Sequence, residues 1–362
     1  MRVTAFTKYD REAASTRQRF LQYGPSLAKA GIELQHRPLL GDDYVRSLAT
    51  REHWSRAALL RSYASRIAEL LRGPTADLIW IHAELLPYLP FVFDKLVFRS
   101  GIPIVYDWDD AFFLKYDESP NALVRLLLSG KLEKLIARAD AAMCGNGYLR
   151  DFASRYCART LLFPTVVDTD VYLPQPTSRK QLVIGWIGSP TSWHNVRPVL
   201  PLLGEICAQT NALFRVVGAG VGAEGDRFPG MELVDWTEDR EVAEVQGFDI
   251  GIMPLVDAPF ERGKSGYKLV QYMACGVPAV ASPVGANTSV MTADCGIFAS
   301  TGAEWRDALA RLLDDEDLRQ RYGRSGRARA VAQYSLQLYA PRLTTLFKEL
   351  AEQSVRMPST RR

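Results

Sequence analysis

The stretch GKSGYKLVQYMACGVPAVASPVG, residues 263–285, contains a loop, a helix, a helix stop and a buried strand in succession. Residues 268–275 carry apolar side chains at helical spacing, and Gly276 followed by Pro278 ends such a helix. The apolar run 277–281 is typical of a buried strand. The loop before the helix consists of Lys264, Ser265, Gly266 and Tyr267.

This loop and helix predict a binding site for a phosphate. Backbone N–H groups at a helix N-terminus attract anions, helped by the positive end of the helix dipole. Lys264 and Lys268 add positive charge beside it. A lysine in a first helical turn is unfavourable unless an anion compensates it, and the alternative for Lys268 is a side chain that meets only solvent. We therefore expect a nucleotide or a sugar phosphate at this loop.

The composition is that of an ordinary globular protein. With 362 residues, 47% of them hydrophobic and 23% charged, the chain is long enough for two domains. Its net charge of +3 is too small to indicate nucleic-acid binding. Five scattered cysteines indicate reduced thiols, and four dispersed histidines give no sign of a metal site. No apolar run approaches the ~20 residues that span a bilayer, so we expect a cytoplasmic protein, free or at the inner face of the membrane.

Strand-like and helix-like runs alternate along both halves, which predicts the α/β class with two Rossmann-like, doubly wound domains facing a cleft. We expect an N-terminal domain at 1–164, a C-terminal domain at 165–335, and a helix and tail at 336–362 that pack back toward the first domain. Helices are expected at 17–30, 45–71, 123–138, 198–210, 268–275, 305–313, 318–333 and 339–350. Strands are expected at 2–7, 78–81, 102–107, 141–144, 182–187, 214–217, 250–254 and 277–281.

The run FRVVGAGVGA, residues 214–223, matches a dinucleotide-binding fingerprint, which requires a helix that opens at its glycines. Residues 224–230 contain two more glycines and a proline, which argues against such a helix. We therefore interpret Gly218 as a loop glycine that lets the backbone approach a ligand closely, and not as part of a nicotinamide site.

Three carboxylates follow an apolar strand in the first half. Asp107, Asp109 and Asp110 cannot all ionise in one place without a partner. They can bind the hydroxyls of a second substrate, steer a base or hold a divalent cation. The structural alternative is a helix N-cap beside two solvated acids.

Arginines mark two helical regions of the first half. Arg17 and Arg19 are candidates for binding an anion, because a cation in a first helical turn is otherwise unfavourable. An ion pair with the aspartates is the equal alternative. A second series of arginines recurs every five residues, so its members point in different directions around a helix and do not share one face. We favour a solvated helix, and the alternative is a helix that lies on a membrane surface. The members of this series are Arg46, Arg51, Arg56, Arg61 and Arg66.

The order of several motifs resembles a known family. PTVVDTDVYLP at 164–174 is followed by VVGAG at 216–220, ACGVPAVASPVG at 274–285 and DLRQRYGRSGRARA at 317–330. The chain resembles the glycosyltransferases of family 4, from residue 164 to 350 above all. The resemblance implies the GT-B fold, a nucleotide-sugar donor in the second domain, an acceptor in the first, net retention of anomeric configuration, and neither metal nor cofactor.

The chain departs from the family pattern at the two glutamates that usually stand eight positions apart. Gly263 and Gln271 occupy those positions, and Glu261 can replace the first only if the loop is two residues longer. Gln271 can still bond a ribose hydroxyl. The usual arginine and lysine after the first strand of the second domain are also absent, and Gly188 and Ser189 stand there.

We therefore predict a retaining, metal-independent glycosyltransferase that uses a glycan or lipid-linked acceptor, in polysaccharide or glycoconjugate biosynthesis, with the membrane as a further partner. The alternatives are a catalytically silent binding or assembly protein, and an epimerase or phosphorylase of the same fold. The predicted catalytic residues are Asp107, Asp110 and Lys268. The predicted donor-binding residues are Gly188, Ser189, Gly218, Lys264, Ser265, Gly266, Tyr267, Lys268 and Gln271. The predicted acceptor-binding residues are Arg17, Arg19 and Asp109.

Overall fold

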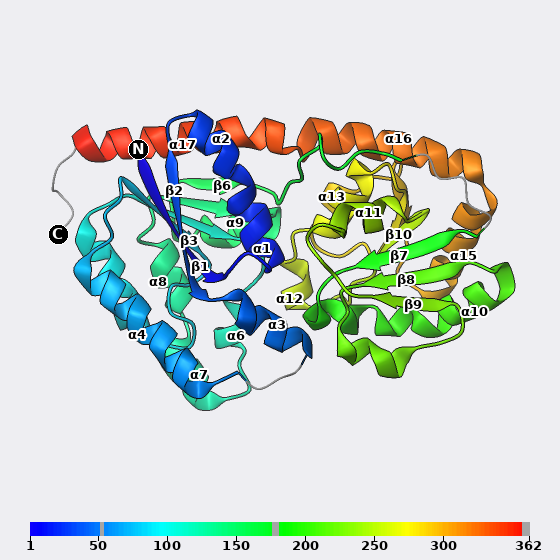
Figure 1. Cartoon of the computed structure of the whole chain (residues 1–362), viewed down its shortest axis with the longest axis horizontal. Helices are drawn as coiled ribbons and strands as arrows, with labels where there is room; N and C mark the ends of the chain where they lie inside the picture. Colours follow the sequence, from blue (N-terminus) through cyan, green and yellow to red (C-terminus); the bar gives the residue numbers. More distant parts are fainter. Residues whose placement is uncertain (51–53, 176–180, 357–362) are drawn as a thin grey trace.

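The computed structural model describes residues 1–50, 54–175 and 181–356, which form two parallel six-stranded sheets (Figure 1). The strand orders are β2-β1-β3-β4-β5-β6 and β12-β11-β10-β7-β8-β9. This confirms the predicted α/β class with two doubly wound domains. The first sheet comprises β1 (Arg2–Tyr9), β2 (Glu33–Leu40), β3 (Leu78–His82), β4 (Ile104–Trp108), β5 (Ala141–Cys144) and β6 (Thr160–Leu162). The second comprises β7 (Val183–Ile187), β8 (Leu213–Val217), β9 (Met231–Val234), β10 (Ile250–Met253), β11 (Ala279–Ala281) and β12 (Gly296–Phe298).

Four of these strands were not expected from the sequence, and all four are edge strands: β2, β6, β9 and β12. The central strands β3, β4 and β7 are buried at every position, whereas β9 is only partly buried throughout. An edge strand covered on fewer sides needs no continuous apolar run, so its sequence resembles a loop.

Helices cover both faces of the first sheet, and three long helices expected there are divided. The expected helix 17–30 is split near Pro25, which has no N–H to donate, and 123–138 is split at Gly130, where φ is +68°. The expected helix 45–71 is two helices, and Arg51 between them lies outside the described residues. The first-domain helices are α1 (Ala14–Arg19), α2 (Gly24–Lys29), α3 (Asp42–Thr50), α4 (Arg56–Arg72), α5 (Phe91–Asp94), α6 (Leu114–Asp117), α7 (Ala122–Leu128), α8 (Lys131–Ile136) and α9 (Gly147–Ala153).

The five helices expected from residue 198 onward are present, with ends that differ by up to six residues, and α13 begins directly after the loop 263–266. Three short helices in this region were not expected: Glu241–Gln246, Pro259–Arg262 and Asn287–Val290. After Gly220 the chain forms a short 3-10 helix, Val221–Asp226, and not the α-helix that a dinucleotide site requires. The helices are α10 (Leu200–Thr210), α11 (Glu241–Gln246), α12 (Pro259–Arg262), α13 (Tyr267–Ala274), α14 (Asn287–Val290), α15 (Gly302–Asp314), α16 (Glu316–Gln333) and α17 (Leu336–Arg356).

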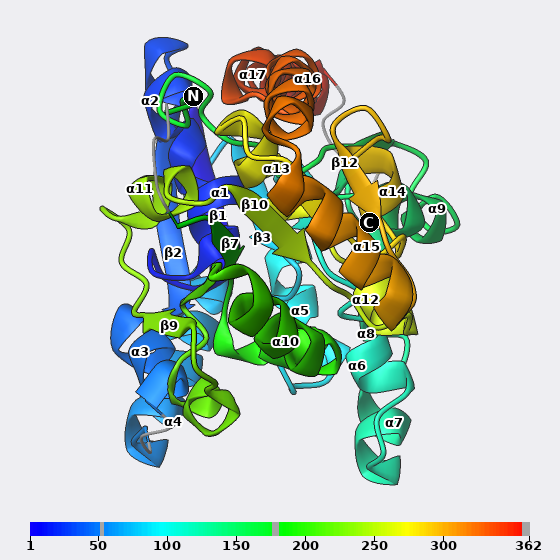
Figure 2. The same ribbon diagram turned by 90° about the vertical axis from the view of Figure 1, so that its right-hand side faces the viewer.

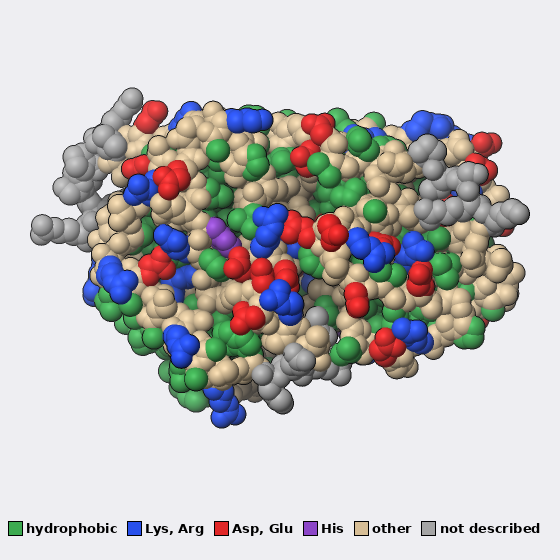
Figure 3. Space-filling view, viewed as in Figure 1, with side chains coloured by type: hydrophobic (Ala, Val, Ile, Leu, Met, Phe, Trp, Pro, Cys, Tyr) green, Lys and Arg blue, Asp and Glu red, His purple; other side chains and the backbone are tan. Residues whose placement is uncertain are grey.

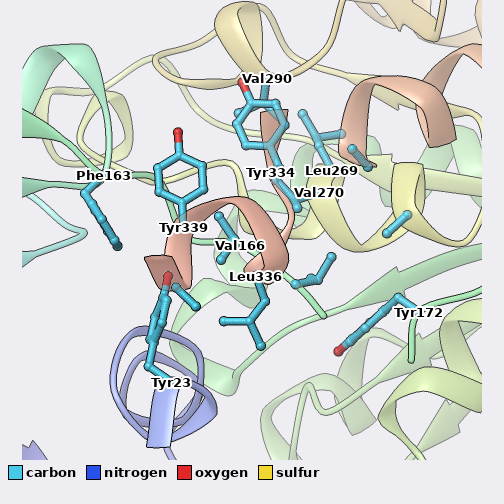
Figure 4. Packing of buried hydrophobic residues seen from close by; sticks show 14 of the residues in the cluster. Tyr23, Phe163, Val166, Tyr172, Leu269, Val270, Val290, Tyr334, Leu336 and Tyr339 are labelled. Carbon is cyan, nitrogen blue, oxygen red and sulfur yellow. The ribbon is translucent and has the colours of Figure 1, made fainter. Parts of the chain in front are cut away.

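The last helix returns to the first domain. Figure 1 shows α16 and α17 running along one side of both domains. Phe347 of α17 packs on Trp80 of β3, with ring centroids 5.1 Å apart. Tyr339 lies 5.0 Å from Phe163, which in turn packs near Tyr23, so the start of α17 closes the core between the domains (Figure 4). This packing joins the two domains along one side of the molecule.

Two chemical findings complete the fold. The five cysteines are buried free thiols: Cys144, Cys157, Cys207, Cys275 and Cys295. Within the residues that the structure describes, no helix combines the length and the hydropathy needed to cross a bilayer.

Candidate functional site

Two glycines bring the carboxyl ends of β7 and β8 into close contact. Gly218 has φ +79°, and a Cβ atom on it would lie 2.4 Å from the Gly188 carbonyl oxygen. A Cβ atom on Gly188 would in turn lie 2.8 Å from Cε of Lys268. The structure therefore brings together three predicted donor residues from separate segments, and a side chain at Gly188 would clash with both Trp186 and Lys268. Ser189 next to them is exposed, and its hydroxyl pairs with that of Thr191 at 2.9 Å.

Lys268 is a partly buried cation beside the cleft. Its Nζ lies 5.4 Å from the centre of the Trp186 ring. Burial, reinforced by the charge of Lys264, lowers the pKa of Lys268 to about 8. No carboxylate lies within ion-pair distance of its ammonium in the described part of the chain. A cation held in this way favours a bound anion.

The loop before α13 is packed against the first domain. Gly266 caps α13 with φ +69°, and the first amides of a helix have no acceptor within the helix. The Asn146 amide donates to the carbonyl oxygens of Gly263 at 2.7 Å and of Lys264 at 3.0 Å. A Cβ atom on Gly263 would lie 2.5 Å from that of Ala111, so this position has no room for a glutamate in the closed arrangement. Ser265 and Tyr267 in the same loop are partly buried.

Gln271 belongs to a buried network centred on Glu241. The Gln271 amide donates to Glu241 Oε1 at 3.0 Å and to the Tyr172 hydroxyl at 3.2 Å. The Trp236 indole donates to Glu241 Oε2 at 2.8 Å. Arg17 of the first domain donates to the same oxygen at 2.8 Å, with both side chains 7% exposed. The amide predicted to contact a ribose therefore lies beside a carboxylate that comes from α11.

A second acid of this domain lies before the loop. Glu261 is 6% exposed, and its Oε1 lies 3.1 Å from Nε2 of His194. His194 belongs to the 3-10 helix Pro190–Asn195 that follows Gly188 and Ser189. Glu261 is therefore buried against the segment that follows β7, and its role as a replacement for the first glutamate stays a prediction.

The three aspartates of the first domain do not converge. Asp107 is buried: it accepts from Nε of Arg19 at 2.5 Å and from the Trp80 indole at 3.0 Å. Asp109 pairs with His82 at 3.3 Å. Asp110 faces Lys264 at 3.7 Å.

This separation bears on two predictions. Asp107 and Arg19 form a buried ion pair, which is the alternative that the sequence left open for Arg19, and a contact of either residue with a substrate stays a prediction. In the described segments no group of three or more His, Cys, Asp or Glu side chains is arranged so that it could hold a metal ion.

Burial and charge set different pKa directions for the two aspartates at the cleft. Burial would raise the pKa of Asp109, but the hydrogen bond and charge of His82 and the charge of Arg19 hold it below its usual value. Burial raises the pKa of Asp110 to about 6, and the Lys264 ammonium limits that rise. Of these two aspartates, Asp110 is the one whose pKa lies closer to neutral pH.

Ion pairs cross the cleft at a second place. Arg17 reaches Glu241 and lies over the Trp236 ring, 4.2 Å from its centre. Arg11 forms an exposed pair with Glu238, at 2.6 Å. Figure 3 shows charged side chains of both signs gathered over the middle of the molecule. The predicted acceptor residue Arg17 therefore holds the two domains together in this structure.

The sequence analysis overlooked four residues: His82, Glu84, His194 and Glu241. A strand-end position could have identified His82, because it directly follows the expected strand 78–81. Glu241 gave no such signal, because its partners apart from Trp236 come from three distant segments, which contain Arg17, Tyr172 and Gln271.

The sequence and the structure were compared with those of known proteins. Residues 181–315 match the sequence family described as Glycosyl transferases group 1. No curated relative matches the chain. Sucrose-phosphate synthase from Thermosynechococcus elongatus has a similar structure, with TM-score 0.74 and 13% identity over 97% of this chain and 99% of that chain.

Two further structures are similar over their full length. Anabaena HepE, solved in complex with UDP and glucose, gives TM-score 0.69 and 13% identity over 96% of this chain and 99% of that chain. The trehalose 6-phosphate synthase of Burkholderia multivorans gives TM-score 0.65 and 14% identity over 98% and 99%. The chain therefore has the two-domain GT-B fold of these glycosyltransferases, and its second domain is similar in sequence to the glycosyl transferases group 1.

Proposed function

We propose that this protein is a glycosyltransferase that takes a sugar from a nucleotide-sugar bound to its second domain. The single observation that carries the proposal is the environment of Lys268: a cation without a carboxylate partner in the described structure, beside Gly188 and the start of α13. Loop amides at 265–267 and this ammonium suit the diphosphate of the donor, whose negative charge grows as the glycosidic bond breaks. HepE, which is similar in structure, was solved with UDP.

The cleft must open for the donor to enter. Lys264 is engaged by Asp110, and the carbonyl groups of the loop are engaged by Asn146. In our proposal, donor binding frees Lys264 from Asp110 and turns it toward the phosphate. Domain closure would then exclude water and so limit hydrolysis of the donor.

Donor binding gives the direct test. A thermal-shift panel of UDP, GDP, ADP and dTDP, with and without their sugars, should raise the melting temperature for at least one nucleotide. Radiolabel from the matching nucleotide-sugar should then appear in a glycan or lipid fraction. If no nucleotide stabilises the protein, the proposed donor site is wrong.

Membership of family 4 and retention of configuration remain part of the proposal. The stereochemistry would follow from attack on the same face that the diphosphate leaves. Proton NMR of the first product measures the anomeric configuration directly, before any mutarotation. A product inverted relative to the donor would exclude this mechanism while leaving the transferase activity in place.

A lipid-linked acceptor and membrane association are supported by exposed leucines on two helices. Leu123, Leu126 and Leu127 of α7 are 61%, 80% and 54% exposed. Leu60 of α4 is 71% exposed. Figures 1 and 2 show α4 and α7 projecting at the end opposite α16 and α17. Three arginines flank these leucines and have no acidic partner in the described chain: Arg56, Arg61 and Arg125. Exposed leucines beside such arginines suit an anionic bilayer surface.

Flotation with vesicles tests the membrane partner. Wild-type protein should float with phosphatidylcholine vesicles that contain phosphatidylglycerol, and less with phosphatidylcholine alone. Leu126→Ser should reduce flotation, whereas Val331→Ser, at another exposed apolar position on α16, should not. Equal flotation of both variants would exclude this surface.

A second candidate function is a silent binding protein of the same fold. The observation that favours it is that Asp107 pairs with Arg19 and Asp109 pairs with His82. Of the three aspartates, Asp110 has the longest ion pair, 3.7 Å to Lys264. Nucleotide binding without any transfer or donor hydrolysis would establish it. The five buried free thiols agree with a cytoplasmic location for either function.

A further inference from the structure

A cluster of aromatic rings lies at the carboxyl edge of the first sheet, away from the ion pairs described above. Tyr9 ends β1, and Tyr44 of α3 stacks on it with ring centroids 5.9 Å apart and an angle of 18°. Trp54 meets Tyr44 edge-on at 5.0 Å, and its indole donates to Asp43 at 2.9 Å. Tyr9 and Tyr44 are partly buried, so one part of each ring still meets solvent.

Tyr88 forms the opposite side of this cluster. It is 56% exposed and has φ +58°, a left-handed conformation that is unfavourable for a bulky residue. Its N–H donates to the hydroxyl of Tyr116 at 2.9 Å, and the two rings meet edge-on at 5.7 Å. The surrounding structure therefore holds an aromatic side chain out toward solvent at a cost in backbone energy.

Lys115 connects the two sides. Its Nζ lies 4.1 Å from the centre of the Tyr88 ring. Burial raises the pKa of Tyr9, and the charge of Lys115 opposes that rise, so the ammonium is also within electrostatic reach of Tyr9. Glu84 lies 3.8 Å from Lys115 and accepts a hydrogen bond from the Tyr116 hydroxyl at 2.5 Å. These two contacts hold Lys115 and Tyr116 in place. Glu84 is only 2% exposed, whereas Lys115 is partly exposed and keeps free N–H donors.

This cluster has the chemistry of a sugar-binding surface. Aromatic faces pack against the apolar face of a pyranose ring, and the phenol and ammonium groups at their margins can bond its hydroxyls. Its place also fits: Glu84 is two residues beyond His82, which pairs with Asp109 at the cleft. Lys115 belongs to α6, and in Figure 1 α3 and α6 lie on the side of the first domain that faces the second. None of these groups is needed to hold a nucleotide on the second domain.

We propose that Tyr9, Tyr44, Tyr88 and Lys115 form the subsite that binds a pyranose ring of the acceptor glycan. The assignment of that ring as the acceptor rests on the proposed transferase function; the binding of a glycan to this surface does not. The subsite acts by stacking and hydrogen bonding, and it positions the acceptor for the cleft without taking part in bond making or breaking.

Saturation-transfer NMR tests the subsite without a donor. The probes are methyl α- and β-glycosides of glucose, galactose, mannose and N-acetylglucosamine. At least one should receive saturation from the protein. Tyr88→Ala and Tyr44→Ala should each weaken its apparent affinity by about five- to tenfold, the range that loss of one aromatic contact gives. Lys115→Ala should weaken it less than either. The matched control is Tyr156→Ala, because Tyr156 is 39% exposed on a different surface, next to Phe152.

The outcomes separate this inference from the proposed function. No signal from any glycoside, or equal signals from wild type, Tyr88→Ala and Tyr44→Ala, would overturn the subsite even if a nucleotide binds. Nucleotide-induced thermal shifts should be unchanged in all the tyrosine variants. If wild-type protein shows no thermal shift with any nucleotide, the donor site is contradicted. Glycoside binding that depends on Tyr88 would still support the aromatic surface in that case. Where transfer is measured, Tyr88→Ala should raise the acceptor KM with little change in kcat.

Discussion

The carboxyl edges of the two sheets face each other, and the contrast between Asp107 and Lys268 shows two ways in which they hold charge. At the first edge the cations and carboxylates are paired: Arg19 with Asp107, and His82 with Asp109. At the second edge two glycines and a helix start surround Lys268, which has no such partner in the described structure. Paired charges inside a protein hold the fold, whereas a cation kept without a partner is available to a ligand. The following changes test this contrast.

The largest effect is expected for the buried pair of the first edge. Arg19→Met should lower the free energy of unfolding by about 3–5 kcal/mol, because Asp107 would remain buried without its counter-charge. Both side chains are 1% exposed in the structure. Denaturant unfolding measures the change. Arg99→Met is the control, since Arg99 is exposed and forms no ion pair within the described chain. If the two variants have the same free energy of unfolding, the Arg19–Asp107 pair does not stabilise this edge of the sheet.

The matching change at the second edge should act on binding and not on folding. Lys268→Ala should weaken nucleotide diphosphate binding by about 10- to 100-fold, the loss expected for one charged hydrogen bond. Isothermal titration calorimetry measures the affinity, and the free energy of unfolding should change little, because Asp110, which Lys268 attracts without an ion pair, keeps its pair with Lys264. Lys29→Ala, at an exposed lysine of α2, should bind as wild type does. A Lys268→Ala variant with full affinity would remove this residue from the donor site.

The pH dependence of binding follows from the same environment. The free protein has a Lys268 pKa of about 8, lowered from 10.5 by burial and by Lys264. A bound diphosphate favours the charged ammonium and so raises this pKa. Affinity should therefore be constant below the free-protein pKa and fall as pH rises through it, by up to about tenfold per pH unit.

Calorimetry across this range, with Lys268→Arg as the comparison, checks the assignment. Arginine stays charged throughout, so that variant should lose the alkaline decline. An alkaline decline that persists in Lys268→Arg would assign the titration to another group.

The smallest effects are expected for the ion pairs that bridge the cleft. Arg11 and Glu238 are 59% and 42% exposed, so Arg11→Ala should change stability by less than about 1 kcal/mol. Arg17→Ala should cost more, about 2 kcal/mol, because Glu241 is buried, although Tyr172, Trp236 and Gln271 still donate to it. Denaturant unfolding of the two variants compares them. A larger loss for Arg11→Ala would reverse this ranking of the two contacts.

Sequence pattern alone located much of the second edge. Gly188, Gly218 and Lys268 lie in three separate motifs, and the rule that parallel strands share a carboxyl edge was enough to bring them together. The first edge was harder. Asp107, Asp109 and Asp110 look equivalent in the sequence, but their partners are Arg19, His82 and Lys264, and nothing local distinguishes those partners. The tyrosine cluster was not anticipated at all, because it joins segments around residues 9, 44, 88 and 115.

The sequence by itself determined the α/β class, the two domains and the loop that begins α13, because each depends on periodicity, glycine and proline within a short stretch. The tertiary structure alone decided which charges are available. Whether a carboxylate or an ammonium is paired depends on side chains brought together across the fold, and burial then strengthens each pairing. Asp107 and Lys268 both looked catalytic in the chain; the fold gave one a buried partner and left the other without one.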